Sequence, residues 1–158
     1  MTLIELVIVI VVLGIIAGVA TVKMNNSMSF SSGIQATKIS QDIRHAQSLA
    51  INWGCELDFT TTTTNYAFTN RTAMAGKICN TAGSAIKDPA TGNNFSISLK
   101  DGVTFTAGIG TFYFDSLGRP NDNLGLLTTP SSFTISGNNA IWTIVVSPIT
   151  GFVTSTKL

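Results

Sequence analysis

Few of the residue types that carry catalysis stand at useful spacings in this chain. His45 is the only histidine, and Asp42 precedes it by three residues, close enough on a helix for the two side chains to meet. Such a pair would suit acid–base chemistry, although a solvated helix face is the simpler interpretation. The motifs G-x-S-x-G, H-E-x-x-H and the phosphate-binding loop are absent from the sequence. The sequence therefore predicts that the protein is not an enzyme.

Oxygen ligands gather in one predicted loop, at Asp115, Asn121, Asp122 and Asn123. Calcium binds such groups, but their spacing does not match an EF-hand. We expect a polar turn here and no cofactor, with calcium at the Asp115–Asn123 loop as the alternative.

Cys55 and Cys79 are the only cysteines. Two sulfurs and one histidine cannot complete a tetrahedral metal site. In an oxidising compartment the two thiols are expected to form a disulfide that stabilises the fold by roughly 3 kcal/mol. Two unpaired buried thiols are the alternative.

Charge is too scarce in this chain to attract a polyanion. Charged residues make up 11% of the 158 residues, and the formal net charge is +1. The basic side chains are scattered and are offset by aspartates, so no nucleic-acid-binding surface is predicted. The length suits about one domain. After Lys23 the chain is rich in Thr, Ser, Asn and Gly, which favours an extracytoplasmic location.

Glu5 is the only charged side chain in the first 22 residues. A helix over Leu3–Val22 would be apolar on every side and about 30 Å long, the thickness of a bilayer core. A carboxylate within such a helix costs about 2.5–3.5 kcal/mol and needs a partner. Thr2 and Glu5 fit a capping box. If Met1 is the mature N-terminus, its amine is a second partner, and pairing between neighbouring chains would fix the register of assembled helices.

Gly14 and Gly18 form a G-x-x-x-G motif within the same apolar segment. Small residues at this spacing let the backbones of two helices approach closely. With Met1 and Glu5, they are the residues that we expect to mediate assembly.

The start of the chain resembles a known family. M-T-L-I-E-L, followed by an apolar run with Gly14, resembles the mature N-terminus of type IV pilins and of type II secretion pseudopilins. The resemblance implies a leader removed by a prepilin peptidase, methylation of Met1, and assembly on an inner-membrane platform. It covers about 22 positions and departs from the family at Met1, where Phe is usual. It departs again at Val22, where many pilins have proline, so a helix break at this position is less strongly predicted than in those pilins.

Beyond Lys23 the pattern becomes amphipathic. Apolar residues recur at helical spacing with polar residues between them, at Ile34, Ile39, Ile43, Ala46, Ala50 and Trp53. This stripe predicts that the helix continues along a sheet, loosened near Gly14–Gly18 and Gly33, and that it stops at Gly54. The chain thus divides into a hydrophobic helix (1–23), the amphipathic half of the same helix (24–54) and a head domain (55–158).

The head is predicted to consist of antiparallel strands. Short alternating runs between turn residues give eight of them: Glu56–Thr60, Tyr66–Thr69, Phe95–Leu99, Val103–Thr106, Thr111–Asp115, Ser132–Ser136, Ile141–Ser147 and Phe152–Ser155. The segment 148–151 suits a four-residue hairpin loop around a type I turn, with Gly151 at positive φ.

Two stretches of the head carry a second resemblance. F-D-S-L-G-R-P (114–120) and S-P-I-T-G-F-V (147–153) are similar to H-type pseudopilins of type II secretion and to minor pilins of mannose-sensitive haemagglutinin-type pili. This similarity implies an α+β pilin fold, in which a long helix packs on one or two antiparallel sheets.

The expected function is that of a structural subunit of a type IV pilus-like filament. Its partners would be further copies of itself, related pilins, the prepilin peptidase and the inner-membrane assembly platform. It would be held in the inner membrane with its body outward and then displayed in a surface filament. The alternatives are a periplasmic pseudopilin of type II secretion, and a minor pilin or membrane anchor with a role in adhesion or DNA uptake.

Overall fold

The structure, a computed structural model, describes residues 3–72, 79, 81–88, 91–108, 110–137 and 139–158. Within the helix, the surroundings of the side chains of residues 18–30 are not described. Met1 and Thr2 lie outside the described residues. The expected capping box and the contact with the Met1 amine therefore stay predictions.

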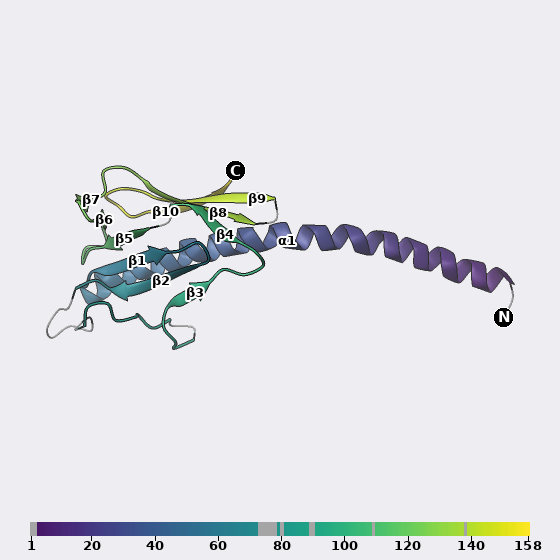
Figure 1. The fold of residues 1–158 in the computed structure, drawn as a ribbon, viewed down its shortest axis with the longest axis horizontal. Coiled ribbons are helices and arrows are strands. Elements are labelled where there is room, and N and C mark those ends of the chain that lie inside the picture. Colours follow the sequence, from purple (N-terminus) through teal and green to yellow (C-terminus); the bar gives the residue numbers. More distant parts are fainter. Residues whose placement is uncertain (1–2, 73–78, 80, 89–90, 109, 138) are drawn as a thin grey trace.

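A single helix, α1 (Leu3–Trp53), forms the first third of the chain. Its 51 residues correspond to a rod of about 76 Å. The second half lies along the head, whereas the first half projects from it with a gentle curve (Figure 1). The expected loosening is not observed, because the helix is unbroken through Gly14, Gly18 and Gly33.

The helix ends where the sequence predicted. The Gly54 N–H donates to the Ile51 carbonyl (3.2 Å) and the Cys55 N–H donates to the Ala50 carbonyl (3.1 Å), which is the Schellman arrangement. Cys55 follows directly and forms a disulfide with Cys79, with 6.2 Å between the two Cα atoms. The predicted disulfide is thus present in the structure.

One face of the second half of α1 forms part of the core. Five of its apolar side chains are completely buried, at spacings of three and four residues: Ala36, Ile39, Ile43, Ala46 and Ala50. Ile34 was predicted to belong to this face but is 53% exposed. At 100° per residue it lies about 160° around the helix from the centre of the buried stripe, so it falls outside the buried face.

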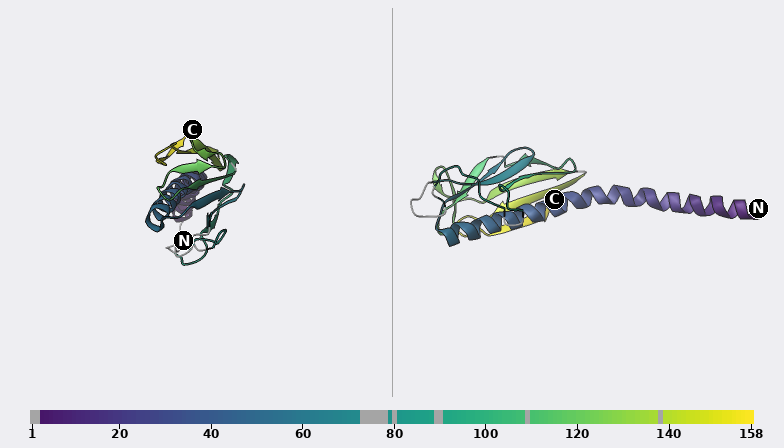
Figure 2. Two further views of the ribbon diagram at one scale, coloured as in Figure 1. Left: turned by 90° about the vertical axis from the view of Figure 1, so that its left-hand side faces the viewer. Right: turned by 90° about the horizontal axis from the view of Figure 1, so that it is seen from below.

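The head contains two antiparallel sheets with different strand orders (Figures 1 and 2). The first sheet runs β3 (Ser96–Ser98), β2 (Asn65–Asn70), β1 (Leu57–Thr61), β5 (Thr111–Phe114), β6 (Pro120–Asp122), β7 (Gly125–Leu126). The second sheet runs β10 (Val153–Lys157), β9 (Ala140–Val146), β8 (Ser131–Gly137), β4 (Thr104–Ala107). Helix α1 contacts β8, β9 and β10 of the second sheet, and β1 and β5 of the first.

Aromatic rings join the two sheets. Phe133 on β8 lies 5.4 Å from Phe59 on β1 and 5.7 Å from Phe112 on β5, measured between ring centroids. Phe59 also faces Phe68 directly across the β1–β2 ladder. Such ring pairs bury large apolar areas and favour tilted or edge-on contacts. The core is therefore shared by both sheets and by the helix.

All eight predicted strands occur, with boundaries shifted by at most two residues. The prediction missed β6 and β7, which pair through Tyr113↔Asn121 and Asn121↔Leu126 within the segment expected to be a polar loop. These strands have two or three residues, and their Pro-Asn-Asp and Gly-Leu sequences show no apolar alternation.

The hairpin of β9 and β10 is confirmed, with Val146 opposite Val153, and Gly151 has φ +68° as expected. Its loop is not a type I turn, because Ile149 also has a positive φ of 66°. A left-handed backbone is unusual for a β-branched residue.

Among the described residues, no helix combines the length and the hydropathy needed to cross a membrane.

Replacing Cys55 and Cys79 together by alanine is expected to lower the free energy of unfolding by about 3 kcal/mol, because the disulfide restricts the unfolded chain across 24 residues. Urea denaturation of the variant and of the oxidised wild type measures this difference. A loss below about 1 kcal/mol would show that the loop is already ordered without the bond.

Candidate functional site

The first candidate site is the projecting part of the helix, residues 3–17, which we call the assembly helix. Its large apolar side chains are all exposed, from 43% for Val7 to 84% for Leu3. These side chains point in every direction around the helix axis, and the head covers none of these directions. A surface of this kind is stable only against lipid or against other apolar helices.

The residues predicted to mediate assembly occupy two faces of this helix. Gly14 and Gly18 follow Glu5 by nine and thirteen residues, which puts them on roughly the opposite side of the helix. No heavy atom lies within 4 Å of the position that a Cβ of Gly14 would take, so the backbone there is open to a neighbour. The carboxylate and the small-residue motif can therefore contact different partners.

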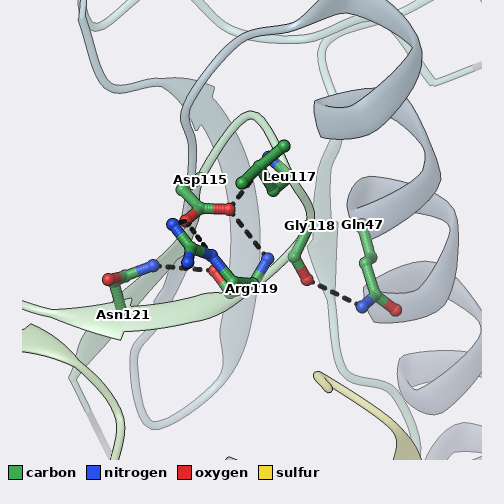
Figure 3. A network of polar contacts seen from close by, with 6 residues as sticks. All are labelled: Gln47, Asp115, Leu117, Gly118, Arg119 and Asn121. Carbon is green, nitrogen blue, oxygen red and sulfur yellow. Dashed lines mark hydrogen bonds and ion pairs between the residues drawn. The ribbon is translucent and has the colours of Figure 1, made fainter. Parts of the chain in front are cut away.

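The second candidate site joins the helix to two turns of the head, and we call it the Gln47 junction. The side-chain Nε2 of Gln47 donates to the carbonyls of Gly118 and Thr150, both at 2.8 Å. Figure 3 shows this amide reaching from α1 to the β5–β6 turn. One side chain thus connects the two stretches, 114–120 and 147–153, that carry the second resemblance. Sequence reasoning missed this contact, because Gln47 is one of several polar residues in the helix.

Both turns approach the helix closely at a glycine. A Cβ on Gly118 would lie 2.6 Å from the Ile51 side chain, and one on Gly151 would overlap the Gln47 amide and lie 3.0 Å from Phe114. Both glycines also have φ near +70°, which other residues adopt at a cost. The two turns are therefore fixed in position against α1.

The β5–β6 turn is held by its own carboxylate. Asp115 accepts hydrogen bonds from the N–H groups of Leu117 and Arg119, both at 2.9 Å, and forms an ion pair with the Arg119 guanidinium at 2.8 Å (Figure 3). Burial alone would raise the pKa of Asp115, but the hydrogen bonds from Arg119 and Leu117 outweigh it and hold this pKa below its usual value. The ionised carboxylate therefore holds the turn in its conformation through these two hydrogen bonds and the ion pair.

The predicted oxygen ligands of this region are not arranged around one point. Asn121 is buried and donates to the Arg119 carbonyl, Asp122 accepts the Leu124 N–H, and Asn123 accepts from Arg71. Among the described residues, no group of three carboxylates, histidines or cysteines is placed to hold a metal ion. Calcium binding at the Asp115–Asn123 loop stays a prediction.

Asp42 contacts Tyr66 and Lys38 in place of His45. The Tyr66 hydroxyl donates to Asp42 at 2.6 Å, and Lys38 pairs with the same carboxylate oxygen at 3.0 Å. Burial, followed by this hydrogen bond, raises the pKa of Tyr66. His45 was expected on a solvated face, but it is half-buried beside Phe95, and its Nε2 makes no hydrogen bond among the described residues. The acid–base pair considered from the sequence is therefore not formed.

A long helix with a projecting apolar half, packed on an antiparallel two-sheet head, is the pilin fold. A search of solved structures agrees. The chain superposes on the minor pseudopilin EpsH of the type 2 secretion system of Vibrio cholerae, with a TM-score of 0.53 and 18% sequence identity, over 80% of this chain and 94% of that one. No family profile matches the sequence, and no curated protein does. The comparison confirms the predicted α+β pilin-like fold.

Replacing Gln47 by Glu is expected to lower the free energy of unfolding by about 1–3 kcal/mol, because a carboxylate oxygen then faces two carbonyls that lose their donor. Urea denaturation at neutral pH measures the loss. Ser48→Ala on the next, exposed position is the control and should change stability by less than about 0.5 kcal/mol. Equal effects of the two substitutions would mean that the junction contributes nothing specific.

Asp115 predicts an acid-sensitive component of stability. Because its folded pKa lies below the ordinary 3.8, its contribution is complete above that value and is lost as the pH falls through the folded pKa. Denaturation curves recorded between about pH 6 and pH 2 give the free energy of unfolding at each pH. As the pH falls, this free energy should decrease more steeply for the wild type than for Asp115→Asn. The comparison is Asp122→Asn, which alters a carboxylate that accepts the Leu124 N–H. If the free energy of unfolding depends on pH equally in the wild type and in Asp115→Asn, Asp115 does not provide this acid-sensitive component.

Proposed function

We propose that this protein is a structural, non-enzymatic subunit of a helical filament, built by side-by-side packing of its assembly helix. The observation that carries this proposal is the exposure of every large apolar side chain on residues 3–17, in a helix fixed to a well-packed head. A plain membrane anchor would account for the apolar surface. It would leave Glu5 unexplained.

Glu5 sets the register of the packed helices in this proposal. It is the only carboxylate within the first 22 residues, and it lies in the first turn of α1. In a bundle of apolar helices a carboxylate is costly unless a cation meets it, and the nearest candidate is the Met1 amine of an adjacent copy. A staggered copy that fails to bring the two groups together loses this contact between chains, so one axial offset is favoured.

Gly14 and Gly18 provide the second contact of each helix. Their side of the helix is free of large side chains at these two positions, which lets a neighbouring backbone approach closely. Because this face lies opposite Glu5, each copy would use the carboxylate toward one neighbour and the glycines toward another. Two different contacts per helix are what an extended assembly requires.

The proposal includes a path to the filament. Before assembly the same helix would hold the chain in the inner membrane with its head outside. A prepilin peptidase would remove a leader, with methylation of Met1, and an inner-membrane platform would add the subunit to the growing filament. These steps are carried over from the resemblance of residues 1–22 to mature pilins.

Two kinds of filament fit this description. The type IV pilus-like surface filament is our first choice from the sequence, whereas the structural similarity to EpsH favours a pseudopilus of type II secretion. Sheared surface fibres containing this chain would indicate a pilus. Loss of protein export without such fibres, after deletion of the gene, would indicate a pseudopilus.

Glu5→Ala is expected to reduce the yield of filaments by at least about tenfold, because the register contact is removed. Sedimentation of fibres from the producing cells, quantified against total subunit, measures the yield. Glu56, the other glutamate of the chain, provides the matched control, and Glu56→Ala should assemble normally. Wild-type yields from Glu5→Ala would rule out the register role.

A further inference from the structure

The neck of α1, which we define as residues 31–36, is held on both flanks where the helix leaves the head (Figure 1). On one flank Gln35 meets the backbone of Lys100. Its Nε2 donates to the Lys100 carbonyl (3.0 Å), and its Oε1 accepts the Lys100 N–H (2.9 Å). The hydroxyl of Ser31, one helical turn earlier, donates to the Asp101 carboxylate at 2.6 Å. The helix is thus bonded to the turn between β3 and β4.

This β3–β4 turn has a well-defined backbone. The Val103 N–H donates to the Lys100 carbonyl at 3.0 Å, and Asp101 and Gly102 both have positive φ, of 55° and 70°. Positive φ at both central residues is characteristic of a type I′ turn. Strand β3 belongs to the first sheet and β4 to the second, so the chain passes between the sheets at this turn. Gln35 is therefore linked to both sheets.

An indole ring lies against the other flank of the neck. Trp142 on β9 approaches Gly33 so closely that a Cβ there would be 2.9 Å from the ring, and Trp142 itself packs against the core. At 100° per residue, Gly33 lies about 100° to one side of the centre of the buried stripe, and Gln35 about 60° to the other side. Rotation of α1 about its axis would break the Gln35 hydrogen bonds or press the helix backbone into the indole. We call these contacts the neck clamp, and its members are Ser31, Gly33, Gln35, Lys100, Asp101 and Trp142.

The neck clamp also sets the directions in which the assembly helix presents its residues, because α1 is unbroken over Leu3–Trp53. At 100° per residue, Glu5 lies about 180° around the axis from the centre of the buried stripe, whereas Gly14 lies in line with that stripe. Glu5 is therefore on the side of α1 opposite the head, and Gly14 is on the side of the head.

The side opposite the head is the one from which a parallel neighbour can reach Glu5. In the proposed filament, the contact between Glu5 and the Met1 amine of an adjacent copy sets a stagger of a few residues, so the two helices run beside each other for most of their length. Packed helices have their axes about 8–10 Å apart. On the side of the head, that space is filled by strands β8, β9 and β10, which contact α1. Access to Glu5 therefore depends on the rotational position in which α1 leaves the head.

We propose that the neck clamp positions Glu5 for assembly by fixing its rotational phase relative to the head, with Gln35 and Gly33 as positioning residues. This inference rests on the proposed function, since it takes the Glu5 contact between copies as given and adds a requirement on where the head must point. The clamp residues lie outside the assembly helix, so they act on assembly through the direction of the helix. A changed phase turns the head of one copy toward the helix of the next, even when the head itself is fully folded.

Alanine insertions between Met24 and Asn25 test the phase, because this position lies outside both the assembly helix and the neck. Two alanines turn Glu5 by about 200° relative to the head and lengthen α1 by about 3 Å, whereas four turn it by about 40° and add about 6 Å. We expect the two-residue insertion to lower the yield of sedimented filaments by at least about tenfold, and the four-residue insertion to stay within about threefold of the wild type. Thermal denaturation should match the wild type for both, since alanine favours a helix and the head is unchanged.

The two insertions distinguish phase from length. An effect of length grows with the number of inserted residues, whereas an effect of phase follows the helical period. Equal yields from the two insertions, or a greater loss with four alanines than with two, would overturn the inference and leave the proposed function intact. If the wild-type chain forms no filaments, the proposed function fails first and this inference with it.

Gln35→Ala tests the clamp itself. The N–H and carbonyl of Lys100 that lose their partner are at the surface and can bind water, so the thermal stability of the variant should stay close to that of the wild type. The filament yield should nevertheless fall by about threefold or more. Gln41→Ala, which alters another exposed glutamine of the same helix, is the matched control and should assemble normally.

Spin labels measure the direction of the assembly helix in these variants. Nitroxides on Ile10→Cys and Thr154→Cys are placed in the full chain in detergent, and labelling spares Cys55 and Cys79 because they form a disulfide. We expect the distribution of distances between the two labels to be broader in Gln35→Ala than in Gln41→Ala. Equal distributions in the two variants would show that Gln35 does not position the assembly helix and would overturn its role.

Discussion

The structure depends on one constraint, which is that an apolar rod with a single charge cannot remain in contact with water. Residues 3–17 expose all of their large apolar side chains because the head ends before it can cover them. Every other part of the chain is compatible with an ordinary small globular domain. The exposure of this helix is the ground on which we propose a larger assembly, and it draws attention to Glu5, since a carboxylate among apolar side chains is costly without a partner.

The head packs against only one side of the second half of α1. Small and medium side chains on α1, such as Ala36, Ala46 and Ala50, let the sheets approach closely, and the aromatic rings between the sheets fill the space behind them. The end of the helix is then secured twice. The Schellman motif at Gly54 and the disulfide at Cys55 terminate it, and Gln47 ties it to two turns. The position of the projecting apolar half relative to the head is therefore fixed by these contacts.

The similarity to EpsH concerns the fold, at 18% sequence identity. It supports the same arrangement of a long helix packed on an antiparallel head. In this chain the surface of the head is mostly Thr, Ser and Asn, with internal ion pairs such as Arg71–Asp58, so exposed apolar groups such as Ile149 and Ile34 are conspicuous.

The sequence by itself determined the long helix, its end at Gly54, eight of the strands, the cysteine pair and the uncharged segment around Glu5. All of these follow from local signals, which are apolar periodicity, turn residues and composition. Only the tertiary structure decided the rest. Ile34 faces outward because the angular position of the sheets on the helix selects which apolar residues are buried. Strand β6 forms by pairing with the edge of β5, and β7 then pairs with β6. Gln47 meets Gly118 and Thr150 because contacts distant in sequence bring two turns to one side chain. Such contacts leave no periodic trace in the residues that make them, so they become visible only when the chain is folded.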